Sequence, residues 1–270
     1  MAEWKRRLLN LTESFRSAAE YKKLQRVWDD CLARAPSGDG HPVLILPGFA
    51  ADDRMTEPLR KALTEKGYKA CAWEGGRNMG LNDRTTAHLR DRLAQVFKEN
   101  GNRKVTLIGH SLGGIYAREL AREFPEMVRG VMTVGTPFGV GMAKNAVPNP
   151  LSVFVKMLSK TDLSLDEQDM AQRVLTPPPV PTTSIFSKED GIAGWRACLN
   201  PAALQAENIE VSSSHVGLIW SAKTFGIVLE RLSQPEGGWK PFTGASKDAA
   251  PKNPDWKPGK LSSADLFKKK

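Results

Sequence analysis

From residue 42 onward, short apolar runs alternate with longer segments in which apolar side chains recur every three or four positions. The runs are PVLILPG, ACAWEG, KVTLIG, GVMTVG, TTSIFS and IEVSS, and most of them end in glycine. Segments between them, such as MTEPLRKALTEKG and TTAHLRDRLAQVFKENG, have the spacing of amphipathic helices. This alternation is typical of a parallel sheet covered by helices on both faces. We therefore expect an α/β fold with about six parallel strands in residues 37–232.

The first 36 residues have the periodicity of a helical segment instead. Their apolar positions are Trp4, Leu8, Leu11, Phe15 and Ala18, followed by Leu24, Val27 and Trp28. One interpretation is a helix that covers the edge or a face of the main domain. The other is an anchor at a membrane surface, because basic residues flank the apolar face at Lys5, Arg6, Arg7 and Arg16. Both interpretations remain open.

Two further segments depart from the alternation. Residues 137–181 separate GVMTVG from TTSIFS, which is far longer than a crossover between parallel strands requires. This interval is either a lid or cap insertion over a pocket or an ordinary crossover helix with a long loop. Residues 233–270 are rich in Pro, Gly, Lys and Ser, so we expect a basic tail that is extended or disordered. Its candidate attachment points are Trp239, Phe242 and Trp256.

Composition narrows the class of function and the compartment. The formal net charge is +9, but much of the excess lies at the two ends of the chain, and no central basic stripe interleaves with aromatic residues. We therefore expect no nucleic-acid partner. The N-terminus lacks the apolar run of a signal peptide, and no stretch has the length and apolarity of a membrane span. Three unclustered cysteines favour a cytoplasmic protein without a disulfide framework.

The segment VTLIGHSLGG, residues 105–114, carries the candidate chemistry. A strand that ends in Gly-x-Ser-x-Gly and opens a helix places the serine on a sharp turn above the carboxyl edge of the sheet. Gly109 and Gly113 flank backbone where a Cβ would collide, and Gly114 lets the helix approach the sheet. We predict that Ser111 is a nucleophile.

A serine hydroxyl needs a base that removes its proton and an acid that orients the base. His215, just after the last apolar run, is the predicted base. The other histidines lie before the first strand, on an amphipathic helix, and beside the serine with the side chain expected to point away from the site: His41, His88 and His110. Asp190 is the predicted acid, because it follows the strand TTSIFS at a turn and is shorter than Glu189.

A tetrahedral oxyanion also requires donors, which are usually two backbone N–H groups. Leu112, directly after the serine, offers one at a helix N-terminus. Phe49 is the second predicted donor, on the turn after the first core strand, where Gly48 permits the bend.

Together, the order Ser111, Asp190, His215, the motif GHSLGG, the PGF turn and the insertion resemble the α/β-hydrolase fold family, and within it small bacterial lipases and esterases. The resemblance covers residues 38–232. It implies hydrolysis through an acyl-enzyme on Ser111, without a metal or organic cofactor. Two features depart from the usual pattern: the turn before the first oxyanion donor has a single glycine, and the first two strands of the fold are not evident.

The substrate follows from apolar residues on segments that are expected to converge near the serine: Phe49, Met142, Phe154, Met157 and Trp195. They favour an uncharged apolar acyl ester, either a small molecule or a lipid. A Gly-rich loop with Arg77 and Asn78 either reaches the rim of the site or is an ordinary surface loop. Two alternatives stay open: an acyltransferase or thioesterase with the same three residues, and a non-catalytic binding protein on a hydrolase fold. Contact with an anionic membrane surface is compatible with each of these functions.

Overall fold

A six-stranded parallel sheet forms the centre of the protein. The structure is a computed structural model that describes residues 3–138 and 176–243. The strands are β1 (Pro42–Leu46), β2 (Lys69–Cys71), β3 (Val105–His110), β4 (Val128–Val134), β5 (Thr182–Phe186) and β6 (Ala206–Glu210). They lie in the order β2-β1-β3-β4-β5-β6, and every neighbouring pair is parallel. Each strand overlaps one predicted run, so the predicted α/β fold is confirmed.

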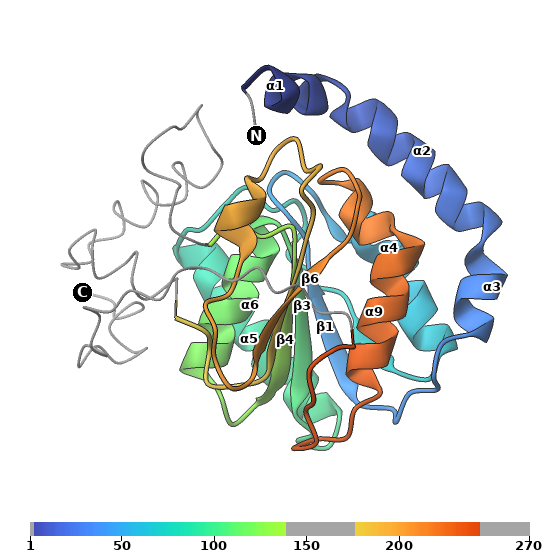
Figure 1. Ribbon diagram of the computed structural model, residues 1–270. Coiled ribbons are helices and arrows are strands. Elements are labelled where there is room, and N and C mark those ends of the chain that lie inside the picture. Colours follow the sequence, from blue (N-terminus) through green and yellow to red (C-terminus); the bar gives the residue numbers. More distant parts are fainter. Residues whose placement is uncertain (1–2, 139–175, 244–270) are drawn as a thin grey trace.

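Seven α-helices and two short 3-10 turns surround this sheet in the described residues. The helices are α1 (Glu3–Leu11), α2 (Glu13–Arg26), α3 (Trp28–Ala33), α4 (Asp53–Glu65), α5 (Asp83–Glu99), α6 (Leu112–Glu123) and α9 (Ala222–Leu232), and the turns are η1 (Trp195–Cys198) and η2 (Gly217–Trp220). Figure 1 shows α5 and α6 on one side of the sheet and α4 and α9 on the other. Polar caps begin two of these helices: the side chain of Asp52 accepts from the Arg54 N–H, and that of Asn82 from the Thr85 N–H.

The core is divided by the sheet into two layers. Because side chains alternate along a strand, Val43 and Ile45 of β1 point to the layer of α4 and α9, while Leu44 and Leu46 point to that of α5 and α6. All four side chains are fully buried. A strand buried on both faces reads as a continuous apolar run, which is the pattern seen in PVLILPG.

The N-terminal helices follow the outside of the domain in an arc, with α1 above the loops at the top of the sheet in Figure 1. Their second half packs on the body, since Leu24 and Leu32 are buried in the layer of α4 and α9. The first half behaves differently: the side chains of Leu11 and Phe15 are 82% and 80% exposed. The apolar face is therefore buried only in its later part.

The two ends of the predicted insertion meet at one arginine of α6. Arg118 is fully buried, stacks on Phe138 with its guanidinium 3.8 Å from the ring centre, and donates to the Thr176 carbonyl at 3.0 Å. The Arg118 guanidinium also donates to the side-chain oxygen of Asn200 at 2.7 Å. The interval 139–175 itself lies outside the described residues. The choice between a lid and an ordinary crossover therefore stays a prediction.

The predicted tail is described only as far as residue 243. In this part, Phe242 packs against the core and its N–H donates to the buried carboxylate of Glu207 at 2.7 Å, which supports one of the three predicted attachment points. Trp256 falls outside the described residues. Among the described helices, none is long and apolar enough to cross a membrane.

Candidate active site

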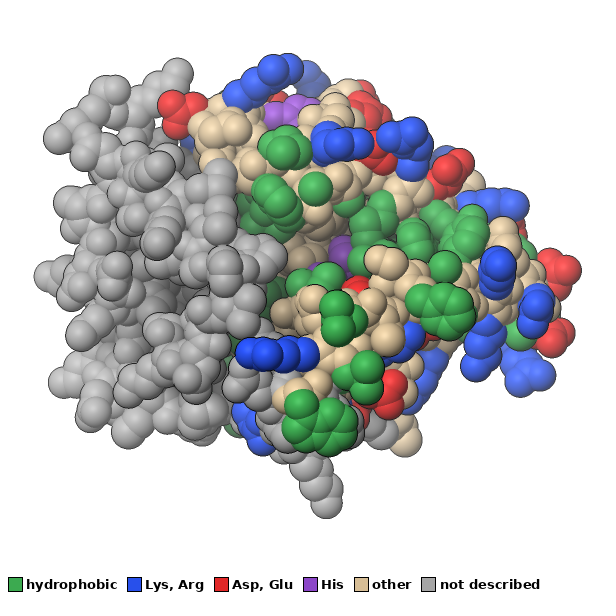
Figure 2. Space-filling view, turned by 90° about the horizontal axis from the view of Figure 1, so that it is seen from above, with side chains coloured by type: hydrophobic (Ala, Val, Ile, Leu, Met, Phe, Trp, Pro, Cys, Tyr) green, Lys and Arg blue, Asp and Glu red, His purple; other side chains and the backbone are tan. Residues whose placement is uncertain are grey.

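The loops that leave the carboxyl ends of the strands form the face with the predicted chemistry. Figure 2 views the molecule from above, so that this face is turned to the reader, and shows hydrophobic side chains around a hollow in which a histidine is visible. In open parallel sheets, ligand sites lie at this edge of the strands. The predicted nucleophile, acid and base all follow the carboxyl end of a strand here: β3, β5 and β6.

Ser111 occupies a strained turn between β3 and α6. Its backbone has φ 50° and ψ −120°, a conformation that residues with a Cβ rarely adopt. The Ser111 N–H donates to the carbonyl of Val134 at 2.9 Å, which ties the turn to the neighbouring strand. Ideal Cβ atoms at Gly109 and Gly113 would collide with the backbone of the opposing segment. This is the strand-turn-helix geometry that the motif predicts for an exposed nucleophile.

Asp190 and His215 form a buried pair next to this turn. Each is 4% exposed, and the His215 Nδ1 lies 2.6 Å from the Asp190 Oδ2. The second carboxylate oxygen, Oδ1, accepts from the N–H groups of Ile192 and Ala193 at 2.8 and 2.6 Å. The carboxylate is thus held on both oxygens, and a single orientation results.

The electrostatics of the pair favour a basic imidazole. Burial by itself lowers the pKa of His215, but the charge and hydrogen bond of Asp190, together with the charge of Glu13, raise it above its ordinary value. Because the carboxylate only accepts, the Nδ1 of His215 carries the hydrogen, which leaves the Nε2 lone pair free of a proton in the neutral ring. That tautomer is the one a base beside a serine requires.

The remaining three histidines have other partners. His41 contacts Asp39 and Thr106 at the amino end of the sheet, and the His88 Nε2 lies 2.7 Å from the Trp73 carbonyl. His110 was expected to point away from the site, and this expectation is wrong. Its Nε2 donates to the His215 carbonyl at 3.0 Å, because the histidine loop packs over the end of β3. Burial and the nearby His215 lower the pKa of His110 to about 3, so His110 is a neutral support.

The loop after β1, predicted to carry an oxyanion donor, lies directly beside the nucleophile. An ideal Cβ on Gly48 would be 3.1 Å from the Cβ of Ser111. Phe49, the next residue, is 45% exposed. Leu112, the other predicted donor, is the first residue of α6 and is buried. Gly48, which precedes Phe49, and Leu112 therefore lie on the two segments next to the serine, and the donor roles stay predictions.

Asn78 organises this oxyanion loop, and its role goes beyond what the sequence indicated. The side-chain Nδ2 donates to the Pro47 carbonyl at 2.8 Å, and the backbone carbonyl accepts from the Ala50 N–H at 2.6 Å. Its Oδ1 accepts from the Tyr116 hydroxyl and the Gly80 N–H at 3.1 Å each. Asn78 is fully buried, so it is a structural anchor at the site, while Arg77 beside it is exposed.

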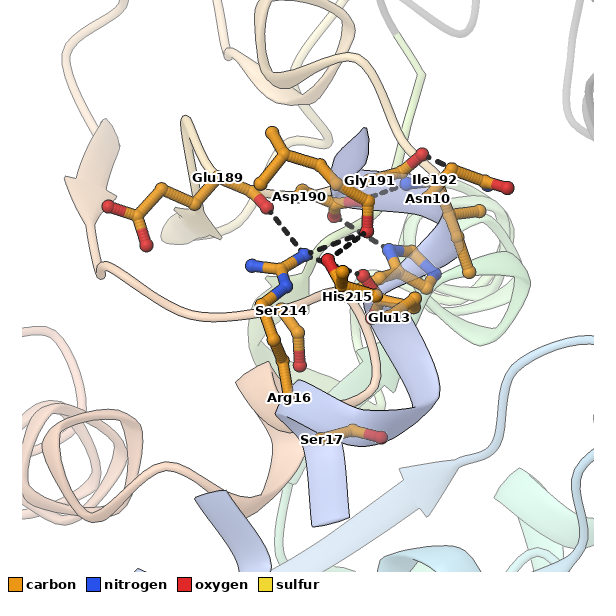
Figure 3. Close-up of polar contacts among 12 residues, drawn as sticks. Asn10, Glu13, Arg16, Ser17, Glu189, Asp190, Gly191, Ile192, Ser214 and His215 are labelled. Carbon is orange, nitrogen blue, oxygen red and sulfur yellow. Dashed lines mark hydrogen bonds and ion pairs between the residues drawn. The ribbon is translucent and has the colours of Figure 1, made fainter. Parts of the chain in front are cut away.

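Four polar residues of α1 and α2 contact the loops of the acid and the base, a feature that sequence reasoning missed. We refer to residues 187–193 as the acid loop, to residues 211–217 as the histidine loop, and to Asn10, Glu13, Arg16 and Glu20 as the clamp residues. Figure 3 shows Asn10, Glu13 and Arg16 reaching both loops from α1 and α2. The signal was present: Glu13, Ser17 and Glu20 recur at helical spacing opposite the apolar stripe.

The predicted substrate-contacting residues divide into two groups. Phe49 follows Gly48 on the loop beside Ser111, as described above. Trp195 is half-buried in η1, where it stacks on Phe186 and contacts the side chains of Lys188 and Arg196. Met142, Phe154 and Met157 lie outside the described residues. Within the described ranges, no group of three or more His, Cys, Asp or Glu side chains is placed to hold a metal ion.

Comparison with known proteins agrees with this fold. The sequence profile of the family described as alpha/beta hydrolase fold matches residues 23–176, more than half of the chain. The protein therefore belongs to the α/β hydrolase fold family. Among solved structures, a monoacylglycerol lipase of Paleococcus ferrophilus is similar, with a TM-score of 0.54, 16% identity, and coverage of 74% of this chain and 96% of that one. A lipase of Bacillus licheniformis gives a TM-score of 0.53 and 17% identity, over 74% and 95% of the two chains.

Curated relatives at low identity are lipases and an esterase. A triacylglycerol lipase of Pseudarthrobacter phenanthrenivorans is 23% identical over 67% of this chain and 63% of its own length, and one of Burkholderia plantarii is 23% identical over 67% and 56%. A pimeloyl-[acyl-carrier protein] methyl ester esterase of Shewanella woodyi is 29% identical over 37% of each chain. The chain thus spans less than two thirds of the length of each of these relatives. Together with the fold, they support a hydrolase.

Proposed function

We propose that the protein is a serine hydrolase that cleaves carboxylic esters of apolar acyl groups. One observation carries this proposal: the buried 2.6 Å contact between Asp190 and His215, beside a serine in the strained turn after β3. A non-catalytic member of the fold has no need to hold a histidine in the tautomer of a base. The names of the relatives, which are lipases and a methyl ester esterase, point in the same direction.

The reaction begins when the Ser111 Oγ attacks the ester carbonyl carbon and the His215 Nε2 takes its proton. Asp190 stays ionised and stabilises the imidazolium. The carbonyl oxygen becomes an oxyanion that accepts from the N–H groups of Phe49 and Leu112. The C–O bond to the leaving group then breaks, and His215 gives its proton to the departing alcohol. Water, deprotonated by His215, attacks the acyl-enzyme, and the carboxylic acid leaves as Ser111 regains its proton.

The preference for apolar acyl groups rests on the rim of the site. Phe49, which follows Gly48 on the loop beside the nucleophile, is 45% exposed, and Met79, on the loop after β2, is 58% exposed. Side chains of this kind favour uncharged chains over charged ones, because burying an unpaired charge against them is costly.

The direct test measures turnover of p-nitrophenyl esters of increasing chain length, with wild type and Ser111→Ala. We expect turnover that falls by about 10⁴-fold or more in the variant, because the nucleophile is lost. A fluorophosphonate should label wild-type protein on Ser111, and the labelled peptide is identified by mass spectrometry.

A matched control separates chemistry from damage to the fold. Ser233→Ala changes an exposed serine at the end of α9 and should leave both turnover and labelling unchanged. If wild type hydrolyses none of the esters and no serine is labelled, the proposed function is wrong. If acyl-CoA is consumed faster than any oxygen ester, the acyl group is right and the leaving group is wrong.

A further inference from the structure

The clamp residues bracket both catalytic partners of the proposed serine. The Asn10 Nδ2 donates to the carbonyl of Gly191 at 3.2 Å, and the Arg16 guanidinium donates to that of Glu189 at 3.0 Å. These two carbonyls lie on either side of Asp190. Each contact joins residues more than 170 positions apart in the chain.

The histidine loop is bracketed in the same way. Glu20 accepts from the Ser214 N–H at 3.0 Å and from the Ser214 hydroxyl at 2.5 Å. Glu13 accepts from the Val216 N–H at 3.0 Å, and the two acceptors therefore lie on either side of His215. Glu13 is only 6% exposed, and its second oxygen accepts from Arg16 at 3.0 Å. The contacts to the acid loop and to the histidine loop are therefore joined through this ion pair.

Glycines in both loops admit the helices at close range. An ideal Cβ on Gly191 would lie 2.6 Å from the carbonyl carbon of Leu9, and one on Gly217 would overlap the carboxylate of Glu20. The contact is therefore made between backbones as well as side chains, and both loops are shaped to receive it. The region matched by the family profile begins at residue 23, so the clamp residues lie before it.

From these contacts we infer that the N-terminal helices are part of the catalytic machinery, and that Glu13 and Glu20 are positioning residues that hold His215 against Asp190 and Ser111. This inference rests on the proposed function. The carboxylate of Glu13 also acts through its charge, since it stabilises the protonated imidazole. The charged or titratable groups around His215 are Asp190 on the acid loop, Glu13, Arg16 and Glu20 on α2, and the neutral His110 on β3.

Two substitutions at Glu13 separate its hydrogen bond from its charge. Glu13→Gln keeps an acceptor for the Val216 N–H and should hold kcat within about threefold, while the pKa of His215 falls and the acidic limb of kcat/KM moves to lower pH. Glu13→Ala removes the acceptor as well and should lower kcat by about 10- to 100-fold with little change in KM, because Glu13 contacts the histidine loop and not the residues proposed to bind the substrate. Glu20→Ala should lower kcat similarly, and Glu20→Gln should restore most of it.

The readout combines kcat and KM over a pH series with an NMR titration of the His215 ring, which requires no turnover. Glu57→Gln and Glu57→Ala, at an exposed carboxylate of α4, are the controls and should match wild type. If the Glu13 and Glu20 variants lower only the melting temperature, with kcat and the titration of His215 unchanged, the helices only stabilise the fold and the inference is wrong. Wild type without turnover or labelling would instead overturn the proposed function.

A second observation concerns the opposite face of the same helices. The clamp side is polar and turned inward, whereas the outward side is apolar: Trp4, Leu8, Leu11 and Phe15 are 67%, 53%, 82% and 80% exposed. The same helical stripe continues at Lys22 and Arg26. Among the described side chains of α1 and α2, the exposed charged ones are all basic: Arg7, Lys22, Lys23 and Arg26.

This helix turns its polar side to the domain and its apolar and basic side chains outward. The partner that matches such a face is apolar and carries negative charge beside its apolar part. The acidic residues of α2, Glu13 and Glu20, are engaged by the loops below and do not oppose such a partner. We propose that the outward face of α1 and α2 docks on an anionic phospholipid surface, with the apolar side chains in the acyl region and the basic ones at the headgroups. Because α1 lies above the loops that carry the site (Figure 1), docking would bring these loops toward the lipid, whatever reaction Ser111 performs.

Sedimentation with phosphatidylcholine vesicles, with and without phosphatidylglycerol, tests this docking. Wild type and Ser111→Ala should bind equally, and more tightly to the anionic vesicles. Leu11→Ser/Phe15→Ser should weaken binding by roughly tenfold or more on both vesicles. Lys22→Gln/Arg26→Gln should weaken it by a similar factor, but only on the anionic ones.

The matched control is Leu204→Ser, which removes an apolar side chain that is 96% exposed just before the amino end of β6, away from the site. It should bind vesicles as wild type does. Equal binding by the stripe variants and wild type would overturn the proposal. So would a wild-type dimer that the Leu11→Ser/Phe15→Ser change converts to monomer, since a second copy would then cover this face.

Discussion

The two halves of the candidate site are built in different ways. The nucleophile half consists of β3, the turn at Ser111, α6 and the adjoining oxyanion loop, and its contacts come from the central strands and their immediate neighbours. The other half consists of the acid and histidine loops, whose outer faces are held by helices from the far end of the chain. The first half is fixed by the fold itself, and the second depends on an addition to it.

This difference implies that catalysis and stability are linked differently on the two sides. A strained turn between a strand and a helix remains in place as long as the sheet is folded. The acid and histidine loops have an internal link, because the Ser187 hydroxyl donates to the Ser213 carbonyl and accepts from its N–H. Their outer contacts, however, can open when the first turns of the chain detach. Local loss of order at the N-terminus would then reduce activity while the core stays folded.

The largest expected effect lies inside the second half, at the contact between the acid loop and the histidine loop. Asp190→Asn keeps the size of the side chain but removes the charge that holds and stabilises the protonated His215. We expect kcat to fall by about 10⁴-fold. The folded state should persist, which circular dichroism checks alongside ester turnover. Activity within tenfold of wild type would show that His215 is oriented by something other than Asp190.

A smaller loss is expected from the nucleophile half. Asn78→Ala leaves the Pro47 carbonyl, the Tyr116 hydroxyl and the Gly80 N–H without their partner, so the oxyanion loop should shift. We expect kcat to fall by about 10²-fold, with KM less affected. Asn100→Ala is the control, because its side chain caps the far end of α5. It should reduce the melting temperature slightly and leave kcat unchanged; equal effects of the two changes would argue against a role of Asn78 at the site.

The smallest expected effect comes from the addition of a single methyl group to a glycine of the acid loop or just after it. Gly191→Ala places a Cβ against the backbone of Leu9, while Gly194→Ala, three residues later, meets nothing within 4 Å. We expect the first change to push the helix from the acid loop and to lower kcat by about tenfold, and the second to be neutral. Limited proteolysis should show earlier cleavage near the N-terminus for Gly191→Ala alone. Similar kinetics for the two variants would mean that the helix contact does not reach the chemistry.

Much of the fold follows from local sequence patterns. The six apolar runs became the six strands, since a strand buried on both faces needs a continuous run and its end needs a turn residue. The turn at Ser111 was predictable from its neighbours in the sequence. Gly109 and Gly113, two residues to either side, occupy positions where a Cβ would collide with backbone. The candidates for the base were few, because the chain has four histidines.

The missing parts depend on pairs that are distant in the chain. The apolar stripe of the first helix left open a helix that covers the domain and an anchor at a membrane surface, and the surface below the helix decides which side faces inward: it is made of loop carbonyls and N–H groups, which bind polar side chains better than apolar ones. Glu13 and Glu20 therefore point inward and Leu11 and Phe15 outward. Asn78 was ambiguous for a related reason: its partners Pro47, Ala50 and Tyr116 become neighbours only when the sheet is assembled.

Arg118 has a consequence for how this chain tolerates change. It contacts Phe138 and Thr176, the described residues on either side of the interval 139–175, so these two positions are fixed relative to each other at one buried point. The entropic cost of closing a flexible segment between two fixed ends grows by only about 0.6 kcal/mol for each doubling of its length. On this scale, a change in the number of residues between Phe138 and Thr176 costs little stability as long as Arg118 holds both of them.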